Sequence, residues 1–223
     1  MAPSLKATAQ DVAMTCSKQF DAKARDWDKH AGKQKIAQVF AAQVQKNVPL
    51  HPAMNLLEFG CGTGLVSMEL QHQVAAITLL DTSPGMIEVL QKKINQQDIT
   101  NMHPRLGDLS TITQGNERFD LIYSNMALHH VINVEQTLAQ LVQLLKPCGT
   151  LCIGDLETED GSFHQDGMQG HHGFDCQQLA TALIQLGLNI EHCYRSHTMQ
   201  KTDAKGQIRN YPLFFLQACS PAP

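Results

Sequence analysis

The sequence has no long hydrophobic run and little charge of either sign. No apolar stretch approaches the roughly 20 residues that a membrane-spanning helix needs, so a membrane protein is not expected. Charged residues make up only 17% of the 223 residues, the formal net charge is -4, and Lys and Arg form no cluster. Because a nucleic-acid surface needs such a cluster, a nucleic-acid partner is not expected, although the composition leaves room for a small local patch.

The seven cysteines show neither a metal-binding spacing nor the even count of a secreted disulfide framework. Their arrangement predicts reduced thiols and a cytoplasmic protein. The first 20 residues lack the basic segment followed by an apolar segment that marks a secretory signal. With 43% hydrophobic residues, the chain predicts one domain over residues 1–223.

Short apolar runs alternate with amphipathic stretches from residue 54 onward, which predicts strands buried on both faces between covering helices. Right-handed crossovers then give a doubly wound, Rossmann-like α/β sheet. The predicted strands are 54–59, 75–81, 102–106, 119–124 and 149–156, followed by 190–194 and 213–219. The predicted helices are 20–45 with a break near Trp27, then 64–73, 83–96 capped by Ser83, 133–149, and one capped by Asp175.

A glycine loop, "EFGCGTG", follows the first strand, and glycine permits backbone angles and close approaches that a Cβ would block. The dinucleotide fingerprint G-x-G-x-x-G would place its third glycine at position 65, where the sequence has Leu65. A phosphate-binding P-loop is also excluded, because no Gly-Lys-Ser/Thr follows. The pattern is E-x-G-x-G-x-G, with glycines at 60, 62 and 64.

Polar residues end the next strands, where ligands bind in parallel α/β sheets. Asp81 ends the second strand, and its carboxylate can accept hydrogen bonds from both hydroxyls of a ribose. Gly107 and Asp108 follow the third strand and could present a backbone N–H and a carboxylate to an adenine edge. Ser124, Asn125 and Met126 end the fourth strand on the opposite side of the same crevice.

Five ordered motifs resemble those of the class I S-adenosylmethionine-dependent methyltransferases. They read "LLEFGCGTG", "ITLLDTSPGMIEVL", "GDLS", "FDLIYSNMALHHV" and "LLKPCGTLCIGDL", and they cover roughly residues 56–156. The tail "EDGSFH…HHGFDCQQLATALIQLGL" is more loosely similar to small bacterial methyltransferases. The resemblance implies a seven-stranded sheet of order 3-2-1-4-5-7-6 with strand 7 antiparallel, an N-terminal helical lid over 1–50 and a core over 51–223.

The resemblance also implies S-adenosylmethionine as the cofactor and a set of residues around it. Glu58 would face the amino group, Asp81 would bind the ribose, and Asn125 and Met126 would face the sulfonium. Trp27 would close the pocket as part of the lid, and a role in helix packing is equally open. The remaining implied contacts are Gly60, Cys61 and Gly62 along the methionine part, Thr82 and Met86 beside the adenine, and Gly107, Asp108 and Leu109 at its edge.

Histidines supply the candidate catalytic and acceptor-binding residues. His129 and His130 follow the fourth strand, and His130 is the predicted general base, with a role in shaping the pocket as the alternative. The segment 163–174 is expected to line or cap the acceptor pocket through His164, His171, His172, Phe163, Met168 and Phe174. No metal is expected there, because adjacent histidines do not easily share one ion.

The predicted activity is methyl transfer from S-adenosylmethionine to a small-molecule acceptor. A chain without a basic patch or an added recognition domain fits an acceptor of that size. Protein or RNA acceptors stay open, as does a cofactor-binding regulatory or interaction module without transfer activity. An NAD-dependent oxidoreductase is disfavoured by the glycine spacing. The acceptor atom and the oligomeric state are not predicted.

Overall fold

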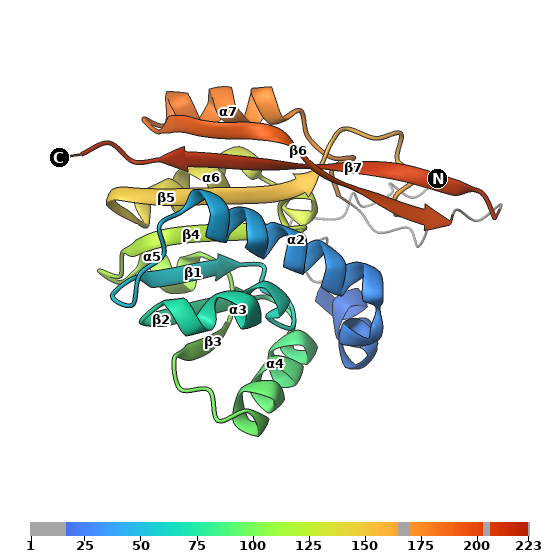
Figure 1. Ribbon diagram of the computed structural model, residues 1–223, viewed down its shortest axis with the longest axis horizontal. Coiled ribbons are helices and arrows are strands. Elements are labelled where there is room, and N and C mark those ends of the chain that lie inside the picture. The colour runs from blue at the N-terminus through green and yellow to red at the C-terminus, as the bar shows by residue number, and fades with distance from the viewer. Residues whose placement is uncertain (1–16, 165–169, 203–205, 223) are drawn as a thin grey trace, which may run out of the picture.

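The computed structural model describes residues 17–164, 170–202 and 206–222. These residues form one seven-stranded sheet of order β3-β2-β1-β4-β5-β7-β6, with helices on both faces (Figure 1). The strands are β1 (Asn55–Phe59), β2 (Ala76–Asp81), β3 (Met102–Leu106), β4 (Phe119–Asn125), β5 (Leu145–Leu156), β6 (Asn189–Thr202) and β7 (Ile208–Cys219). The helices are η1 (Ala24–Lys29), α2 (Ala31–Asn47), α3 (Leu65–Leu70), η2 (Gln71–Gln73), α4 (Pro84–Gln96), α5 (Ser110–Thr113), η3 (Leu128–His130), α6 (Val134–Gln143) and α7 (Cys176–Gln185).

The pairing of the strands confirms the predicted sheet. Strands β1 to β5 pair in parallel, whereas β7 runs antiparallel to both β5 and β6. The strand order reverses between β1 and β4, because β1 pairs with β2 on one side and with β4 on the other. The carboxyl ends of these three strands therefore meet at one edge, where a parallel sheet binds its ligand.

Successive side chains of a strand point to opposite faces of the sheet, and each face packs against its own hydrophobic core. Leu56, for example, packs with α2, α3 and α4 on one face, whereas Leu57 packs with α5, α6 and α7 on the other. Both leucines are fully buried. This pattern explains why the strands read as continuous apolar runs rather than as an apolar and polar alternation.

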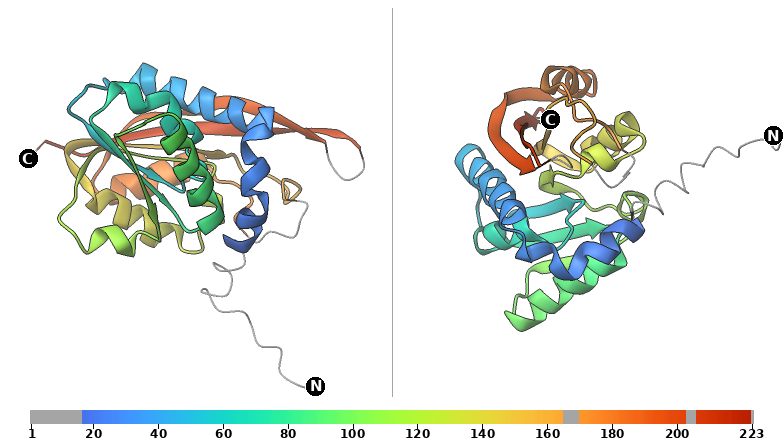
Figure 2. Two further views of the ribbon diagram at one scale, coloured as in Figure 1. Left: turned by 90° about the horizontal axis from the view of Figure 1, so that it is seen from below. Right: turned by 90° about the vertical axis from the view of Figure 1, so that its right-hand side faces the viewer.

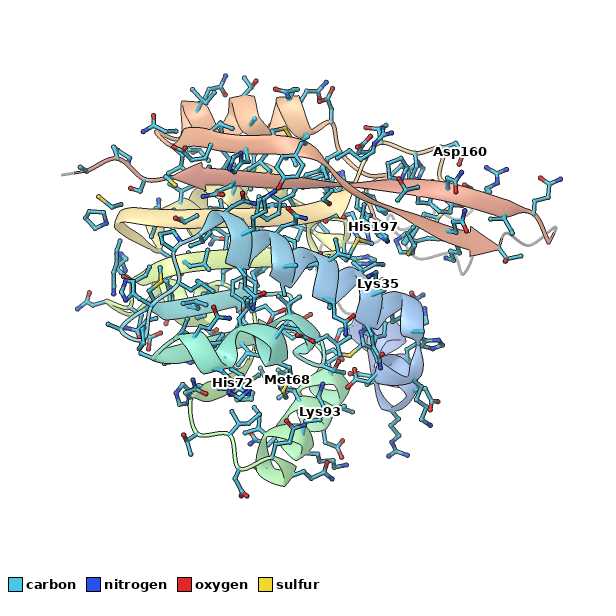
Figure 3. All side chains as sticks on the ribbon, viewed as in Figure 1. Lys35, Met68, His72, Lys93, Asp160 and His197 are labelled. Atoms are coloured by element: carbon cyan, nitrogen blue, oxygen red, sulfur yellow. A yellow bond between two sulfur atoms is a disulfide. The ribbon has the colours of Figure 1, made fainter. Side chains whose placement is uncertain are left out.

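Two aspartates join the N-terminal helical segment to the core. Asp21 accepts hydrogen bonds from Ser83 Oγ at 2.6 Å and from Gly85 N at 2.8 Å, both at the start of α4. Asp28 accepts one from Thr63 Oγ1 at 2.5 Å and forms an ion pair with Lys93 Nζ at 2.7 Å (Lys93 is labelled in Figure 3). The segment therefore lies beside α4, near the carboxyl ends of the parallel strands (Figure 2).

Several predicted elements have different bounds in the structure. The helix predicted over 133–149 ends at Gln143, and Leu145 already pairs with Phe119 in the sheet. The last two strands are much longer than their apolar runs, because β6 and β7 continue as a paired hairpin beyond the rest of the sheet (Figure 1). Their extra residues are largely polar and exposed, so apolar periodicity gave no signal for them.

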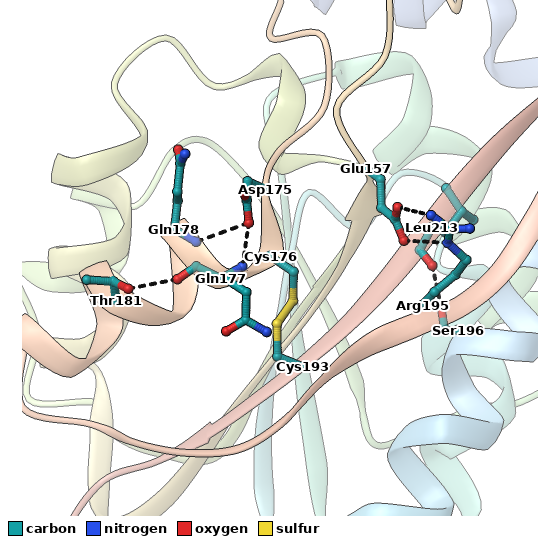
Figure 4. The surroundings of a disulfide bond; sticks show 10 residues. All are labelled: Glu157, Asp175, Cys176, Gln177, Gln178, Thr181, Cys193, Arg195, Ser196 and Leu213. Carbon is teal, nitrogen blue, oxygen red and sulfur yellow. Dashed lines mark hydrogen bonds and ion pairs between the residues drawn. A yellow bond between two sulfur atoms is a disulfide. The ribbon is translucent and has the colours of Figure 1, made fainter.

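The expectation that all cysteines are reduced thiols is wrong for one pair. Cys176 and Cys193 form a disulfide between the start of α7 and β6 (Figure 4). Packing of α7 against β6 brings their Cα atoms to 6.2 Å. This proximity arises from the tertiary fold, and the 17-residue spacing alone did not predict it. None of the helices in the described ranges combines the length and apolar character needed to span a membrane.

Candidate functional site

A cavity of about 1040 Å³ opens at the carboxyl ends of β1, β2 and β4, beneath the N-terminal helical segment. Its lining includes every residue predicted to bind the cofactor and the predicted base His130. These residues are Trp27, Glu58, Gly60, Cys61, Gly62, Asp81, Thr82, Met86, Gly107, Asp108, Leu109, Asn125, Met126 and His130. The structure thus brings together residues that are up to about 100 positions apart in the sequence.

The glycine loop has a backbone that only glycine adopts readily. Gly60, Gly62 and Gly64 all have positive φ angles, of 69°, 53° and 76°. A Cβ at Gly60 would lie 2.3 Å from the Cβ of Ala127, which is closer than atoms can approach. A Cβ at Gly62 would meet only the Met86 sulfur at 3.9 Å, so the space beside this backbone is open for a ligand.

Asp81 is held rigidly at the end of β2. Its two carboxylate oxygens accept hydrogen bonds from Gly62 N at 2.7 Å and from Ser83 N at 2.8 Å. Burial raises the pKa of Asp81, and the backbone donors partly oppose that rise. The carboxylate therefore connects the glycine loop to the N-terminus of α4 and leaves one face toward the cavity.

Glu58 is the second carboxylate of this region and is 3% exposed. Burial raises its pKa to about 8, although the Ser67 hydroxyl donates a hydrogen bond to the carboxylate and lowers the pKa. The Ser67 hydroxyl also contacts the Tyr123 hydroxyl at 2.6 Å. Without a cationic partner, Glu58 is therefore largely protonated at neutral pH.

Asp108 and the end of β4 complete the rim of the cavity. Asp108 accepts hydrogen bonds from the amide and hydroxyl of Ser110, at 2.9 and 2.5 Å, and so shapes the turn before α5. Across the crevice, Met126 has a φ of 57°, a backbone region that non-glycine residues rarely adopt. Strain of this kind, held by the Met126 N to Gly154 O bond, is typical of functional sites.

His129 and Asp155 form a buried pair beside this rim. The side chains are 1% and 0% exposed, and His129 Nδ1 lies 2.5 Å from Asp155 Oδ1. Because a carboxylate oxygen accepts, Nδ1 donates the hydrogen, and Nε2 is the ring nitrogen that Asp155 does not occupy. Asp155 also accepts from the His129 amide, at 3.1 Å, and from the Leu156 amide, which fixes the ring orientation.

His130 and His164 lie against His129. The ring centroids of His129 and His130 are 4.0 Å apart, and His164 lies 5.2 and 5.0 Å from them. Burial lowers the pKa of His130 to about 2, with further contributions from His129 and His164. A group with so low a pKa is a weak proton acceptor near neutrality, so the structure gives the predicted general base little basicity.

The predicted acceptor segment is only partly at the cavity. Phe163 and His164 line it, whereas His171, His172 and Phe174 are not among the lining residues. His171 instead donates its amide to His129 O at 2.7 Å and contacts Val131 O through Nε2, so it holds the loop against η3. Met168 lies outside the described residues.

Several residues that line the cavity lie outside the motifs of the sequence. Phe20 packs edge-on against His130 at 5.0 Å, and Lys33 Nζ lies 3.2 Å from the centre of the Trp27 ring. Lys201 on β6 donates to Phe163 O and lies over that ring. Burial lowers the pKa of Lys33 to about 8. These residues come from the N-terminal segment and the β6 hairpin, where no motif marks them.

Comparison with known proteins identifies the family. A methyltransferase domain model matches residues 57–153. A malonyl-[acyl-carrier protein] O-methyltransferase from Priestia megaterium is 33% identical over 84% of this chain and 73% of its own length. The chain belongs to the class I S-adenosylmethionine-dependent methyltransferases. The cofactor of this family is S-adenosylmethionine. The chain spans 50% to 57% of the length of the first curated relatives that it matches.

A further sequence relative and a solved structure also match the chain. An uncharacterized methyltransferase, C1347.09, from Schizosaccharomyces pombe is 32% identical over 56% of this chain, which spans 50% of that protein's length. The solved magnesium protoporphyrin IX methyltransferase from Synechocystis PCC 6803, with bound S-adenosylmethionine, superposes with a TM-score of 0.69. That match has 16% identity and covers 98% of this chain and 100% of the other, so it supports the fold alone.

The residues of the cavity fit the cofactor chemically. The cofactor carries two cationic groups, an ammonium and a sulfonium, and the rim has three carboxyl groups, on Glu58, Asp81 and Asp108. The open space beside Gly62 admits a ligand in close contact with the backbone. When bound, S-adenosylmethionine supplies a methyl group that is already activated for displacement.

Proposed function

We propose that this methyltransferase methylates a small molecule that enters the cavity from the side of the histidines. The observation that carries the proposal is the chemical division of one continuous cavity. Its acidic part is formed by Glu58, Asp81 and Asp108, and its other part by three histidines and three lysines. Two chemically different ligands, a cationic cofactor and an acceptor, suit such a cavity.

The acceptor part, as we define it, is formed by Phe20, Lys23, Lys33, His129, His130, Phe163, His164 and Lys201. Phe20 and Phe163 face the histidines through edge-on ring contacts of 4.8 to 6.1 Å. Aromatic walls favour a planar or apolar body. Lys23, Lys33 and Lys201 lie near enough that the charges of the first and last lower the pKa of Lys33. This positive potential favours an acceptor with an anionic group.

Alignment and exclusion of water are the chain's proposed contributions to the rate. Displacement at an activated carbon needs the acceptor atom in line, and holding two reactants in that geometry supplies several kcal/mol, on the order of 7 or more. We propose that residues 1–50 act as a lid over the core of residues 51–223, with Trp27 over the cofactor. The contacts of Asp21 and Asp28 with the start of α4 and with the glycine loop support this role.

One sequence relative supports the proposal at the level of chemistry. The Priestia relative is named an O-methyltransferase of a malonyl group on a carrier protein. A malonyl group bears a carboxylate, in agreement with the positive charge of the acceptor part.

Incubation of the protein with methyl-labelled cofactor and a whole cell extract, separated afterwards into metabolite, protein and RNA fractions, tests the proposal. We expect a labelled product of low molecular mass that an anion exchanger retains. Label in protein or RNA would show a macromolecular acceptor and overturn the proposal. Tight binding of S-adenosylhomocysteine without labelled product in any fraction would instead indicate a cofactor-binding module.

A further inference from the structure

The three histidines of the acceptor part form a compact group of nitrogen ligands. His129, His130 and His164 each offer one ring nitrogen, and the three atoms lie within 4.8 Å of one another. Nε2 of His129 and Nδ1 of His130 are buried without a hydrogen-bond partner among the described residues, and Nε2 of His164 is a buried atom as well. A buried nitrogen that makes no hydrogen bond costs the folded protein desolvation free energy, so such atoms usually have a partner.

We propose that His129, His130 and His164 bind one divalent transition-metal ion of the Zn²⁺ type. Neutral imidazole is a ligand that Zn²⁺, Cu²⁺, Fe²⁺ and Ni²⁺ favour, whereas Mg²⁺ and Ca²⁺ prefer oxygen. Three protein ligands with a fourth position open to the cavity is the arrangement of catalytic zinc sites. This proposal rests on the proposed function for its role, but not for the binding itself.

His129 and His130 are adjacent in sequence but can bind the same ion, because they present different ring nitrogens to it. His129 offers Nε2 and His130 offers Nδ1, and the two rings are tilted by 46°. Zn²⁺ holds nitrogens at about 2.0–2.1 Å, so tetrahedral ligands lie about 3.4 Å apart. The widest separation of 4.8 Å must then close by about 1.4 Å, which rotation of the side chains supplies. This geometry removes the objection that neighbouring histidines do not share a metal.

Asp155 is the positioning residue of the proposed site. Metal-binding histidines commonly donate their other ring N–H to a carboxylate, which fixes the ring and strengthens the ligand. His129 does so through Nδ1 to Asp155 Oδ1, at 2.5 Å.

The open metal position defines the acceptor atom. A hydroxyl or thiol bound to such an ion has a lowered pKa and loses its proton to solvent. The oxygen or sulfur of the deprotonated acceptor would then hold the electron pair that forms the bond to the methyl carbon, while the sulfonium leaves as the thioether of S-adenosylhomocysteine. The acceptor is therefore expected to bear an O–H or S–H group, and the metal, rather than His130, assists its deprotonation.

Zinc binding to the whole chain tests the proposal directly. The protein is prepared without a histidine tag, stripped with chelator, and titrated with Zn²⁺ by calorimetry. We expect one Zn²⁺ per chain, at least 10-fold weaker affinity for His164→Ala, and unchanged affinity for the control His103→Ala, which changes an exposed histidine on β3. His164 lies outside the sheet and the helices, so His164→Ala is expected to leave the fold intact. His129→Ala would remove a buried side chain and could unfold the protein, so it is not used as the test.

Cobalt substitution identifies the ligands. Visible bands of the Co²⁺ form without a thiolate-to-cobalt charge-transfer band support nitrogen ligands, and a thiolate band would move the site to a cysteine and overturn the proposal. No stoichiometric Zn²⁺ binding, or unchanged binding in His164→Ala, would overturn it too. Binding of S-adenosylhomocysteine and transfer of label to the acceptor fraction are measured on the same samples, so loss of the metal site is distinguished from loss of the cofactor site and from failure of the proposed methyl transfer.

Discussion

Asp81 is the residue on which the cofactor site depends most directly. Its carboxylate joins Gly62 N and Ser83 N and lies at the end of β2. In Asp81→Asn the charge is lost, and with it the charge-assisted hydrogen bonds to the ribose, each worth about 1.5–3 kcal/mol. We expect the Kd for S-adenosylhomocysteine, measured by calorimetry, to rise about 10- to 100-fold.

The matched control is Glu88→Gln, on the exposed side of α4, where Glu88 forms an ion pair with Lys92. It is expected to leave the Kd unchanged. Equal affinities for Asp81→Asn and the native chain would remove Asp81 from the cofactor site.

Glu58 gives the binding a pH dependence. Its pKa is about 8 in the free protein and is expected to fall beside the cationic amino group of the cofactor. Binding of S-adenosylhomocysteine therefore releases a proton below pH 8, and affinity rises with pH up to that value. Calorimetry at pH 7 in two buffers of different ionisation enthalpy measures the release, which Glu58→Gln abolishes. A native chain that binds with no proton release would contradict this placement.

The same shift affects stability with a definite sign. The folded-state pKa of Glu58 is raised above the ordinary value of 4.5, so the folded chain holds this proton more tightly than the unfolded chain. The contribution is fully present below pH 4.5 and is lost as the pH rises through about 8. Denaturant unfolding of the cofactor-free protein should show Glu58→Gln gaining stability relative to the native chain over this interval.

At the residue scale, the spacing of motifs along the sequence predicted the cofactor residues but not the side chains that meet only through tertiary packing. Asp81 follows from counting residues after Gly60 in a repeating strand and helix pattern. The pairing of His129 with Asp155 does not, because these residues are 26 positions apart and meet only when β5 lies beside β4. Side chains that meet through tertiary packing leave no periodic signal in one sequence.

Asp21 and Asp28 join the N-terminal segment to the core, and Asp28 offers a test of the lid. Asp28 and Lys93 form an ion pair with side chains 29% and 18% exposed. Asp28→Ala should loosen the segment by about 1 kcal/mol and raise the dissociation rate of S-adenosylhomocysteine about 3- to 10-fold. Trp27, the only tryptophan of the chain, reports this in stopped-flow fluorescence.

Asp26→Ala is the control in the same segment, because the Asp26–Lys29 pair has side chains 67% and 76% exposed and does not contact the core. A double-mutant cycle with Lys93→Ala separates the pair from other effects. Dissociation rates that respond equally to Asp26→Ala and Asp28→Ala would argue that this contact does not hold the lid.

At the element scale, buried elements were predictable and edge elements less so. The Ser83 cap of α4 and the Asp175 cap of α7 were read from the sequence and are present, each with its side chain accepting backbone N–H groups. The end of α6 was misplaced because Leu144 and Leu145 continue its apolar pattern while Leu145 already pairs in the sheet. Helix and strand compete for such residues, and the sheet partner decides.

At the scale of the whole molecule, the strand order was predicted from family resemblance, and local patterns supplied only the alternation of strands and helices. That order places the ends of β1, β2 and β4 around one cavity, where all the predicted cofactor residues lie. The acceptor part could not be predicted as well, because it is built from the N-terminal segment, η3 and β6, which are distant in sequence and carry no shared motif.

The crystal structure of the chain with S-adenosylhomocysteine is the most direct test of this account. We expect the ribose hydroxyls on Asp81, the amino group near Glu58 beside the glycine loop, and the sulfur facing Asn125, Met126 and the histidines. A cofactor bound with its ribose away from Asp81, or with its sulfur turned from the histidines, would contradict the account.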